Sequence, residues 1–209
     1  MSFVSVEEAA KAVAAGRFVI ICDDEGRENE GDLMIAAEFA DADAVNFCTI
    51  HGRGLICCAV EPAIADRLGL QLMVPQKDNR SGFGTAFTVS VEAREGVTTG
   101  ISAADRARTI EVLCDPKSTP EDLVSPGHMF PLRAHPEGTL GRGGQTEASV
   151  DLARIAGCRP AGVICEVMNE DGTMARRDDL MKVAAKHDIP MVTVEAIKAY
   201  RKAKKVEAA

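Results

Sequence analysis

The densest group of reactive side chains in the sequence is DDEGRENEGD, residues 23–32, in which more than half of the positions are carboxylates. If this segment is extended, Glu28, Glu30 and Asp32 project to one side and Arg27 to the other. Carboxylate oxygens on one side suit a hard cation such as Mg²⁺, whereas the alternative is a solvated acidic loop. The spacing does not match the calcium loop of an EF-hand, which excludes that type of site.

A second group, RGGQTE, has the residue types of a phosphate site at the start of a helix. Arg142 supplies a forked cation, and Gly143 and Gly144 allow the backbone to approach an anion closely. Thr146 is the expected N-cap of a helix whose free N–H groups favour a phosphate. The alternative is a glycine turn followed by a capped helix. Gln145 places a neutral amide in the middle of this group.

Two single titratable residues are candidates for acid–base chemistry. Glu166 shares a strand face with Ile164 and Met168, so we expect its carboxylate to be poorly solvated and its pKa to be raised unless it is paired. The alternative is a glutamate at a strand end that reaches solvent. His128, in the proline-rich stretch SPGHMFPLR, is a candidate proton shuttle, and its alternative is a structural histidine.

Composition limits the classes of protein to which the chain can belong. It has 209 residues with a net charge of −8, and 46% of the residues are hydrophobic, which indicates one globular domain over residues 1–209. The acidic charge and the absence of a basic, aromatic patch argue against nucleic-acid binding. No apolar stretch approaches the roughly 20 residues of a membrane span, and no signal peptide begins the chain, so we expect a cytoplasmic protein. The seven cysteines include no CxxC pair, as expected of reduced, buried thiols.

Helix and strand patterns alternate along the chain, which predicts an α+β fold with a mixed sheet and α/β-like alternation in a single compact domain. Helices are predicted at 5–16, 42–52, 61–69, 102–115, 146–157, 178–188 and 195–204, and a further helix start at 119–123. Strands are predicted at 17–22, 33–37, 54–60, 85–93, 161–168 and 190–194, with an extended segment at 125–134. Neither GxGxxG nor GxxxxGK[ST] occurs, so the common nucleotide-binding loops have no support.

Several long segments together resemble the 3,4-dihydroxy-2-butanone 4-phosphate synthase family of riboflavin biosynthesis. They are DDEGRENEGDLMIAAE, TAFTVSVEAREGVTTGISAADR, SPGHMFPLRA, GRGGQTEASVDLARIAGCRPAGVICEVMNEDGTMA and PMVTVEAI, in the family's order. The resemblance implies a compact α+β homodimer with active sites at or near the subunit interface. It also implies a carbon–carbon lyase that uses Mg²⁺, or Mn²⁺, to convert ribulose 5-phosphate into the butanone phosphate and formate.

The resemblance also implies roles for individual residues. The family's RENEGD motif places a magnesium ligand on Glu28 and contacts to the sugar phosphate on Arg27 and Asp32. Its RxGHTE loop contacts substrate, and the counterparts here are Arg142, Gly143, Gly144, Gln145 and Thr146. The essential histidine of PGHxFPLR and the glutamate of CE fall on His128 and Glu166, which become the implied catalytic residues. Glu28 and Glu166 are also implied to contact substrate.

Gln145 departs from the family, which has a metal-binding histidine at this position. An amide oxygen can still bind Mg²⁺, but an amide cannot take up or release a proton. In the interpretation we prefer, Gln145 replaces the histidine as a metal ligand and the synthase reaction is kept. The alternatives are a diverged paralogue that isomerises or dehydrates a related sugar phosphate, and a non-catalytic sugar-phosphate-binding protein.

Overall fold

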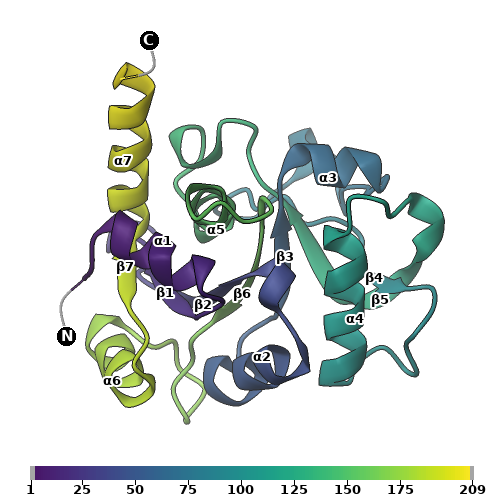
Figure 1. Cartoon of the computed structure of the whole chain (residues 1–209), viewed down its shortest axis with the longest axis horizontal. Helices are drawn as coiled ribbons and strands as arrows, with labels where there is room; N and C mark the ends of the chain where they lie inside the picture. Colours follow the sequence, from purple (N-terminus) through teal and green to yellow (C-terminus); the bar gives the residue numbers. More distant parts are fainter. Residues whose placement is uncertain (1–2, 208–209) are drawn as a thin grey trace.

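The protein is built on one seven-stranded mixed sheet in the order β4-β5-β3-β6-β2-β1-β7 (Figure 1). The computed structural model describes residues 3–207. The strands are β1 Val19–Cys22, β2 Gly31–Ala36, β3 Cys57–Val60, β4 Val91–Ala93, β5 Leu123–Arg133, β6 Ala161–Glu166 and β7 Met191–Thr193. The pairs β1–β7 and β3–β5 are parallel, and the other neighbours are antiparallel. The predicted single compact domain with a mixed sheet is confirmed.

Helices cover both faces of the sheet (Figure 1). Helices α1 (Val6–Ala14), α5 (Gln145–Ile155) and α7 (Val194–Glu207) pack on one face. The other core contains residues of α2 (Ala42–Phe47), α3 (Pro62–Arg67), α4 (Ala103–Cys114) and α6 (Arg177–His187). Since both faces are buried, β1 and β2 are apolar on both sides rather than alternating with polar residues.

Helix α5 lies over the centre of the sheet and contacts β1, β2, β3 and β6. The first nine residues of α5, from Gln145 to Ala153, are all buried. The buried start of this helix therefore faces the middle strands of the sheet.

Most predicted elements are present with shifted ends, and two differ in kind. Residues 119–123 form only a 3₁₀ turn, Pro120–Asp122, because Leu123 already pairs with Ala93 in the ladder of β4 and β5. The predicted strand 85–93 is reduced to β4 and isolated bridges. Its neighbour β5 carries Pro131 there, which has no N–H to donate, so a continuous ladder cannot form.

Local signals place several helix starts correctly. Ser5 and Glu8 form a reciprocal capping box at the start of α1, which the helix predicted at 5–16 includes. Ser102 accepts from the Asp105 backbone N–H at α4, but the Asp105 carboxylate accepts hydrogen bonds from Thr98 and Gly100 instead of closing a box. None of the helices within residues 3–207 has the length and apolar content needed to cross a bilayer.

The cysteines are free thiols, and six of the seven are buried. The adjacent Cys57 and Cys58 belong to the cores on opposite faces of the sheet. This follows from strand geometry, because successive side chains on a strand point to opposite faces of the sheet.

Candidate active site

A cavity of about 360 Å³ opens beside the start of α5, over β2, β3 and β6. This volume lies within the range of small-molecule sites, roughly 300–1,000 Å³. It is lined by Arg27, Glu28, Glu30, Asp32, Cys57, Phe83, Thr85, Phe87, Leu132, Arg142, Gln145, Thr146, Ile164 and Glu166. The structure thus brings together most of the site residues selected from the sequence.

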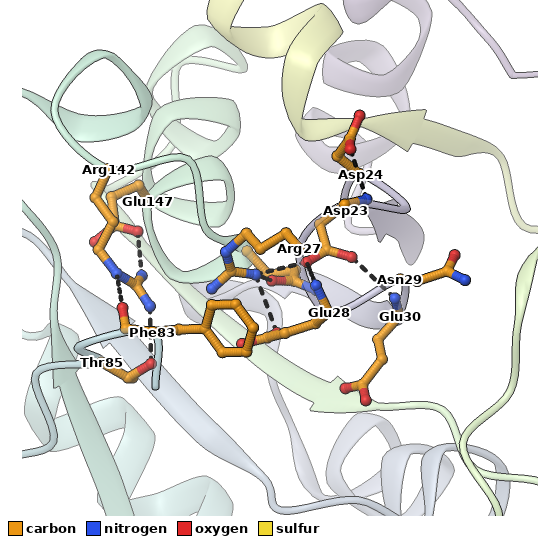
Figure 2. Close-up of polar contacts among 12 residues, drawn as sticks. Asp23, Asp24, Arg27, Glu28, Asn29, Glu30, Phe83, Thr85, Arg142 and Glu147 are labelled. Carbon is orange, nitrogen blue, oxygen red and sulfur yellow. Dashed lines mark hydrogen bonds and ion pairs between the residues drawn. The ribbon is translucent and has the colours of Figure 1, made fainter. Parts of the chain in front are cut away.

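Asp23 organises the acidic loop between β1 and β2. Its carboxylate is 1% exposed and accepts hydrogen bonds from the backbone N–H groups of Glu28 (3.1 Å) and Glu30 (2.9 Å). It also accepts from Arg27 Nη1 at 2.6 Å (Figure 2). These bonds fold the loop into a turn. The prediction that Arg27 projects away from the carboxylates was therefore wrong, because it assumed an extended loop.

Arg27 is the central cation of the cavity. Its Nη1 also donates to Gln145 Oε1 at 2.7 Å and lies 3.0 Å from Glu28 Oε2. The guanidinium lies 4.9 Å from the centre of the Phe83 ring, a cation–π contact (Figure 2).

Gln145 is 5% exposed, and its amide oxygen accepts the hydrogen bond from Arg27. Among residues 3–207, no partner is present for its buried Nε2. Burying an amide N–H without a hydrogen-bond partner costs about 1–3 kcal/mol of stability. Packing of the core alone therefore gives no reason for a glutamine at this position.

The two side-chain oxygens beside Arg27 Nη1 are suitable ligands for a hard divalent cation. Glu28 Oε2 and Gln145 Oε1 are both oxygens, and both approach the same cationic nitrogen. Mg²⁺ prefers oxygen ligands and commonly uses only one or two protein groups, keeping water as the others. The part of the chain that the structure describes contains no cluster of three or more His, Cys, Asp or Glu residues able to hold a metal.

The loop before α5 forms the other end of the cavity. Arg142 donates to Glu147 Oε2 (2.6 Å), to Thr85 Oγ1 (2.8 Å) and to the Phe83 carbonyl oxygen (3.1 Å) (Figure 2). A Cβ at Gly144 would lie 2.4 Å from Arg142 Nη1, so a larger residue there would displace the Arg142 side chain.

The N-cap of α5 is Gly144, with no side-chain hydrogen bond. The prediction of Thr146 as N-cap was wrong, because the helix begins at Gln145, two residues earlier than a cap at Thr146 would allow. Thr146 therefore lies in the first turn, where it lines the cavity. The uncapped helix start and Arg142 together provide donors for an anion.

Glu166 and Asp32 form the carboxyl pair at the base of the cavity. They are direct partners in the antiparallel register of β2 and β6. Burial raises the pKa of Glu166, as the sequence predicted, and its Oε2 accepts from the Leu55 backbone N–H at 2.8 Å. Burial, and then the charge of Glu166, raises the pKa of Asp32 well above its usual range. A Cβ at Gly54 would lie 2.5 Å from Glu166 Oε2, so this approach needs glycine.

His128 does not line this cavity. It lies on β5 with its side chain 47% exposed, and its Nδ1 contacts Glu92 Oε1. In the sheet, β3 lies between the strands of His128 (β5) and Glu166 (β6), so their backbones are roughly 10 Å apart. Within one chain, the side chain of His128 contacts Glu92 rather than Glu166.

Sequence reasoning did not select several residues that shape the site. Phe83 and Thr85 belong to a segment predicted to be a loop and strand. Arg142, which donates hydrogen bonds to both, is at least 57 residues away in the sequence. The role of Asp23 had a local signal, since a short acidic residue after a strand often caps the following turn. Phe83 and Thr85 had no comparable signal.

Comparison with known proteins identifies a family that the chain resembles over most of its length. A family model described as 3,4-dihydroxy-2-butanone 4-phosphate synthase matches residues 7–200. A protein of that name from Pseudomonas aeruginosa is 53% identical over 201 residues, which are 96% of this chain and 54% of that protein. The chain spans about half the length of the curated relatives it matches.

Two solved structures have the same fold. RibBX, a two-domain 3,4-dihydroxy-2-butanone 4-phosphate synthase from A. baumannii, has a TM-score of 0.91 at 48% identity, over 95% of this chain and 58% of that one. A 3,4-dihydroxy-2-butanone 4-phosphate synthase in complex with two magnesium ions has a TM-score of 0.91 at 38% identity, over 97% of this chain and 99% of that one.

Proposed function

Because the chain belongs to the 3,4-dihydroxy-2-butanone 4-phosphate synthase family, we propose that it converts ribulose 5-phosphate into 3,4-dihydroxy-2-butanone 4-phosphate and formate with Mg²⁺. The observation that carries the proposal is the content of one cavity. It combines an anion-binding helix start, two oxygen donors facing a cationic nitrogen, and a buried carboxyl pair. Residues 1–209 act in this proposal as one catalytic domain.

The start of α5 would bind the phosphate. Its free N–H groups and the Arg142 guanidinium favour a dianion, and Thr146 adds a hydroxyl in the first turn. Gly143 leaves the loop backbone open, since nothing lies within 4 Å of a Cβ there. Holding the phosphate at this end directs the carbon chain toward Glu166 and supplies positioning energy.

Glu166 would move the protons. The Leu55 N–H holds Oε2, which leaves Oε1 for a substrate proton. Because burial raises its pKa, the Glu166 carboxyl group is better suited to accept and return a proton, as enolisation and the later steps require. Asp32, the partner of Glu166 across the ladder, would contact the substrate beside it.

Glu28 and Gln145 would hold Mg²⁺, with Mn²⁺ as an alternative. The ion would polarise the substrate carbonyl and stabilise enediolate charge. Arg27, whose Nη1 now contacts both oxygens, would then be free to bind the sugar phosphate. One carboxylate and one amide oxygen can hold such an ion if water and substrate complete its coordination.

We also propose a homodimer in the cytoplasm, in which His128 of one subunit serves the cavity of the other. Its exposure and its distance from Glu166 support this arrangement, as do Val124 and Ile101, exposed apolar residues near the His128–Glu92 contact. Seven free thiols suit a reducing compartment.

Complementation would test the homodimer. Glu28→Ala and His128→Asn chains should each be inactive, and co-refolded chains should recover about a quarter of the activity, since half of the dimers are mixed and each has one intact site. If both variants are inactive and mixing recovers nothing, His128 acts within its own chain; an active His128→Asn chain would mean that His128 has no role.

The main experiment is a formate assay on the purified chain with ribulose 5-phosphate and Mg²⁺. Formate should be released, should require Mg²⁺, and should fall at least about 100-fold in Glu28→Ala. Metal-independent release would refute the mechanism. No formate from the unaltered chain, together with formate from Gln145→His, would identify the chain as a diverged paralogue or a binding protein.

A further inference from the structure

A residue outside the cavity lining, Arg176, holds the loop that carries Glu28. Its Nη1 donates to the Glu28 carbonyl oxygen at 2.7 Å and to the Asn29 carbonyl oxygen at 2.6 Å. The same nitrogen lies 3.8 Å from Glu30 Oε1. Arg176 comes from the start of α6, 148 positions from Glu28 along the chain.

The peptide unit that Arg176 binds has an unusual conformation. Asn29 has a φ of 54°, in the left-handed region that L side chains rarely adopt. A loop held in such a conformation needs contacts that compensate for its strain. The two hydrogen bonds from Arg176 act at this turn, directly beside the side chain of Glu28.

The segment that ends at Arg176 begins at Glu166. After β6, Val167 donates its N–H to the Gly31 carbonyl oxygen (2.9 Å) and accepts at its own oxygen from the Ala175 N–H (3.0 Å). Residues 168 and 174 form a bridge that closes the turn between them. One short hairpin therefore links the carboxylate of Glu166 to the residue that holds Glu28.

We propose that Arg176 is a positioning residue that sets Glu28 for metal binding and fixes its place relative to Glu166. The proposal rests on the proposed function only in taking Glu28 as the metal ligand. Arg176 does not touch substrate or metal, and it acts through the backbone of the acidic loop.

Electrostatics and positioning predict opposite effects of removing Arg176. Its cationic group lies near Glu30 and the rest of the acidic loop, so loss of the charge alone should strengthen the binding of a divalent cation. The side chain of Arg176 is 48% exposed, which makes that charge effect small. Loss of the two hydrogen bonds should weaken binding, since groups that orient metal ligands commonly contribute 10- to 100-fold in affinity.

The test is calorimetric titration of the full-length chain with MgCl₂ in the absence of substrate. We expect Arg176→Met to weaken Mg²⁺ binding about tenfold, and Arg176→Lys, which keeps the charge, to fall between Arg176→Met and the unaltered chain. In the formate assay, Arg176→Met should raise the half-saturating Mg²⁺ concentration while kcat at saturating Mg²⁺ stays within about threefold. Arg176→Lys also covers the case in which Arg176→Met fails to fold.

Arg177→Met is the matched control. This adjacent arginine lies over the Phe3 ring, 5.0 Å from its centre, and its removal also takes one charge from the region. Its Mg²⁺ affinity should be unchanged or slightly higher.

Equal or tighter binding by Arg176→Met, or no Mg²⁺ binding by the unaltered chain, would overturn the proposal. Normal Mg²⁺ binding without formate release would refute the proposed function and leave the role of Arg176 intact.

Discussion

The base of the cavity and its edge are held in place by different interactions. The base consists of strand residues, and its carboxyl pair, Asp32 and Glu166, is aligned by the backbone ladder between β2 and β6. The edge consists of the acidic loop and the loop before α5, where side chains make the decisive contacts. Arg27 reaches Gln145 across 118 positions, and Arg142 reaches Thr85 across 57.

Because they are held differently, the base and the edge of the cavity should respond differently to a ligand and to substitution. A ladder fixes the base whether or not a ligand is bound, because the register cannot shift by one residue without turning every side chain to the opposite face. The edge depends on a few charged hydrogen bonds that a metal or phosphate can replace. We therefore expect base variants to change chemistry or pH dependence, and edge variants to change binding.

The largest expected effect is at the base. Glu166→Gln keeps an oxygen for the Leu55 N–H but cannot transfer a proton, so kcat should fall roughly 10²- to 10⁴-fold. The affinity for Mg²⁺, measured by calorimetry, should stay within about threefold. A variant that loses metal binding as well would show that the base and edge are not separable.

At the edge, Gly144→Ala and Gly143→Ala form a matched pair. A Cβ at Gly144 would lie 2.4 Å from Arg142 Nη1 and 3.0 Å from Glu147 Oε2, whereas nothing lies within 4 Å of one at Gly143. We expect KM for ribulose 5-phosphate to rise about tenfold in Gly144→Ala and to change less than about twofold in Gly143→Ala. Equal changes in both would contradict the assignment of Arg142 to the phosphate.

Gln145→His should have a smaller effect, on the metal alone. An imidazole suits transition-metal ions better than it suits Mg²⁺, which prefers oxygen, so the half-saturating concentration of Mn²⁺ should fall a few-fold relative to that of Mg²⁺. The melting temperature should not rise, since the imidazole brings a ring N–H of its own to the position of the unpartnered Nε2. If neither metal is affected, Gln145 is not a metal ligand.

The smallest effect is on stability and concerns Asp32. Its folded-state pKa is raised above the ordinary value of 3.8, so the folded chain keeps a proton that the unfolded chain releases. The stability that this group contributes is complete below about pH 4 and is lost as pH rises through the folded-state pKa.

Asparagine at this position does not titrate, so Asp32→Asn should avoid that loss. Its melting temperature relative to the unaltered chain should be a few degrees higher at pH 8 than at pH 5, given roughly 2–4 °C per kcal/mol at this size. A difference independent of pH would show that Asp32 is charged in the folded chain.

The sequence predicted the base of the site better than its edge. Strand patterning placed Glu166 on a buried strand and gave the direction of its pKa, because burial and period-two alternation are local properties. The turn at Asp23 and the inward direction of Arg27 depend on hydrogen bonds within a polar loop, where alternation does not apply. The separation of His128 from Glu166 is set by the strand order, which no local pattern encodes.

The hairpin between Glu166 and Arg176 has a consequence for how the chain can vary in length. Its tip, residues 170–173, is exposed or nearly so and carries the polar residues of an ordinary surface turn, the kind of place where insertions are usually tolerated. Here both ends of the hairpin are fixed. One end carries Glu166, and at the other Arg176 donates to the carbonyl oxygens of Glu28 and Asn29. An added or deleted residue would change the reach of Arg176, so the turn should accept substitutions, except at Gly172 with its φ of 86°, and should accept length changes poorly.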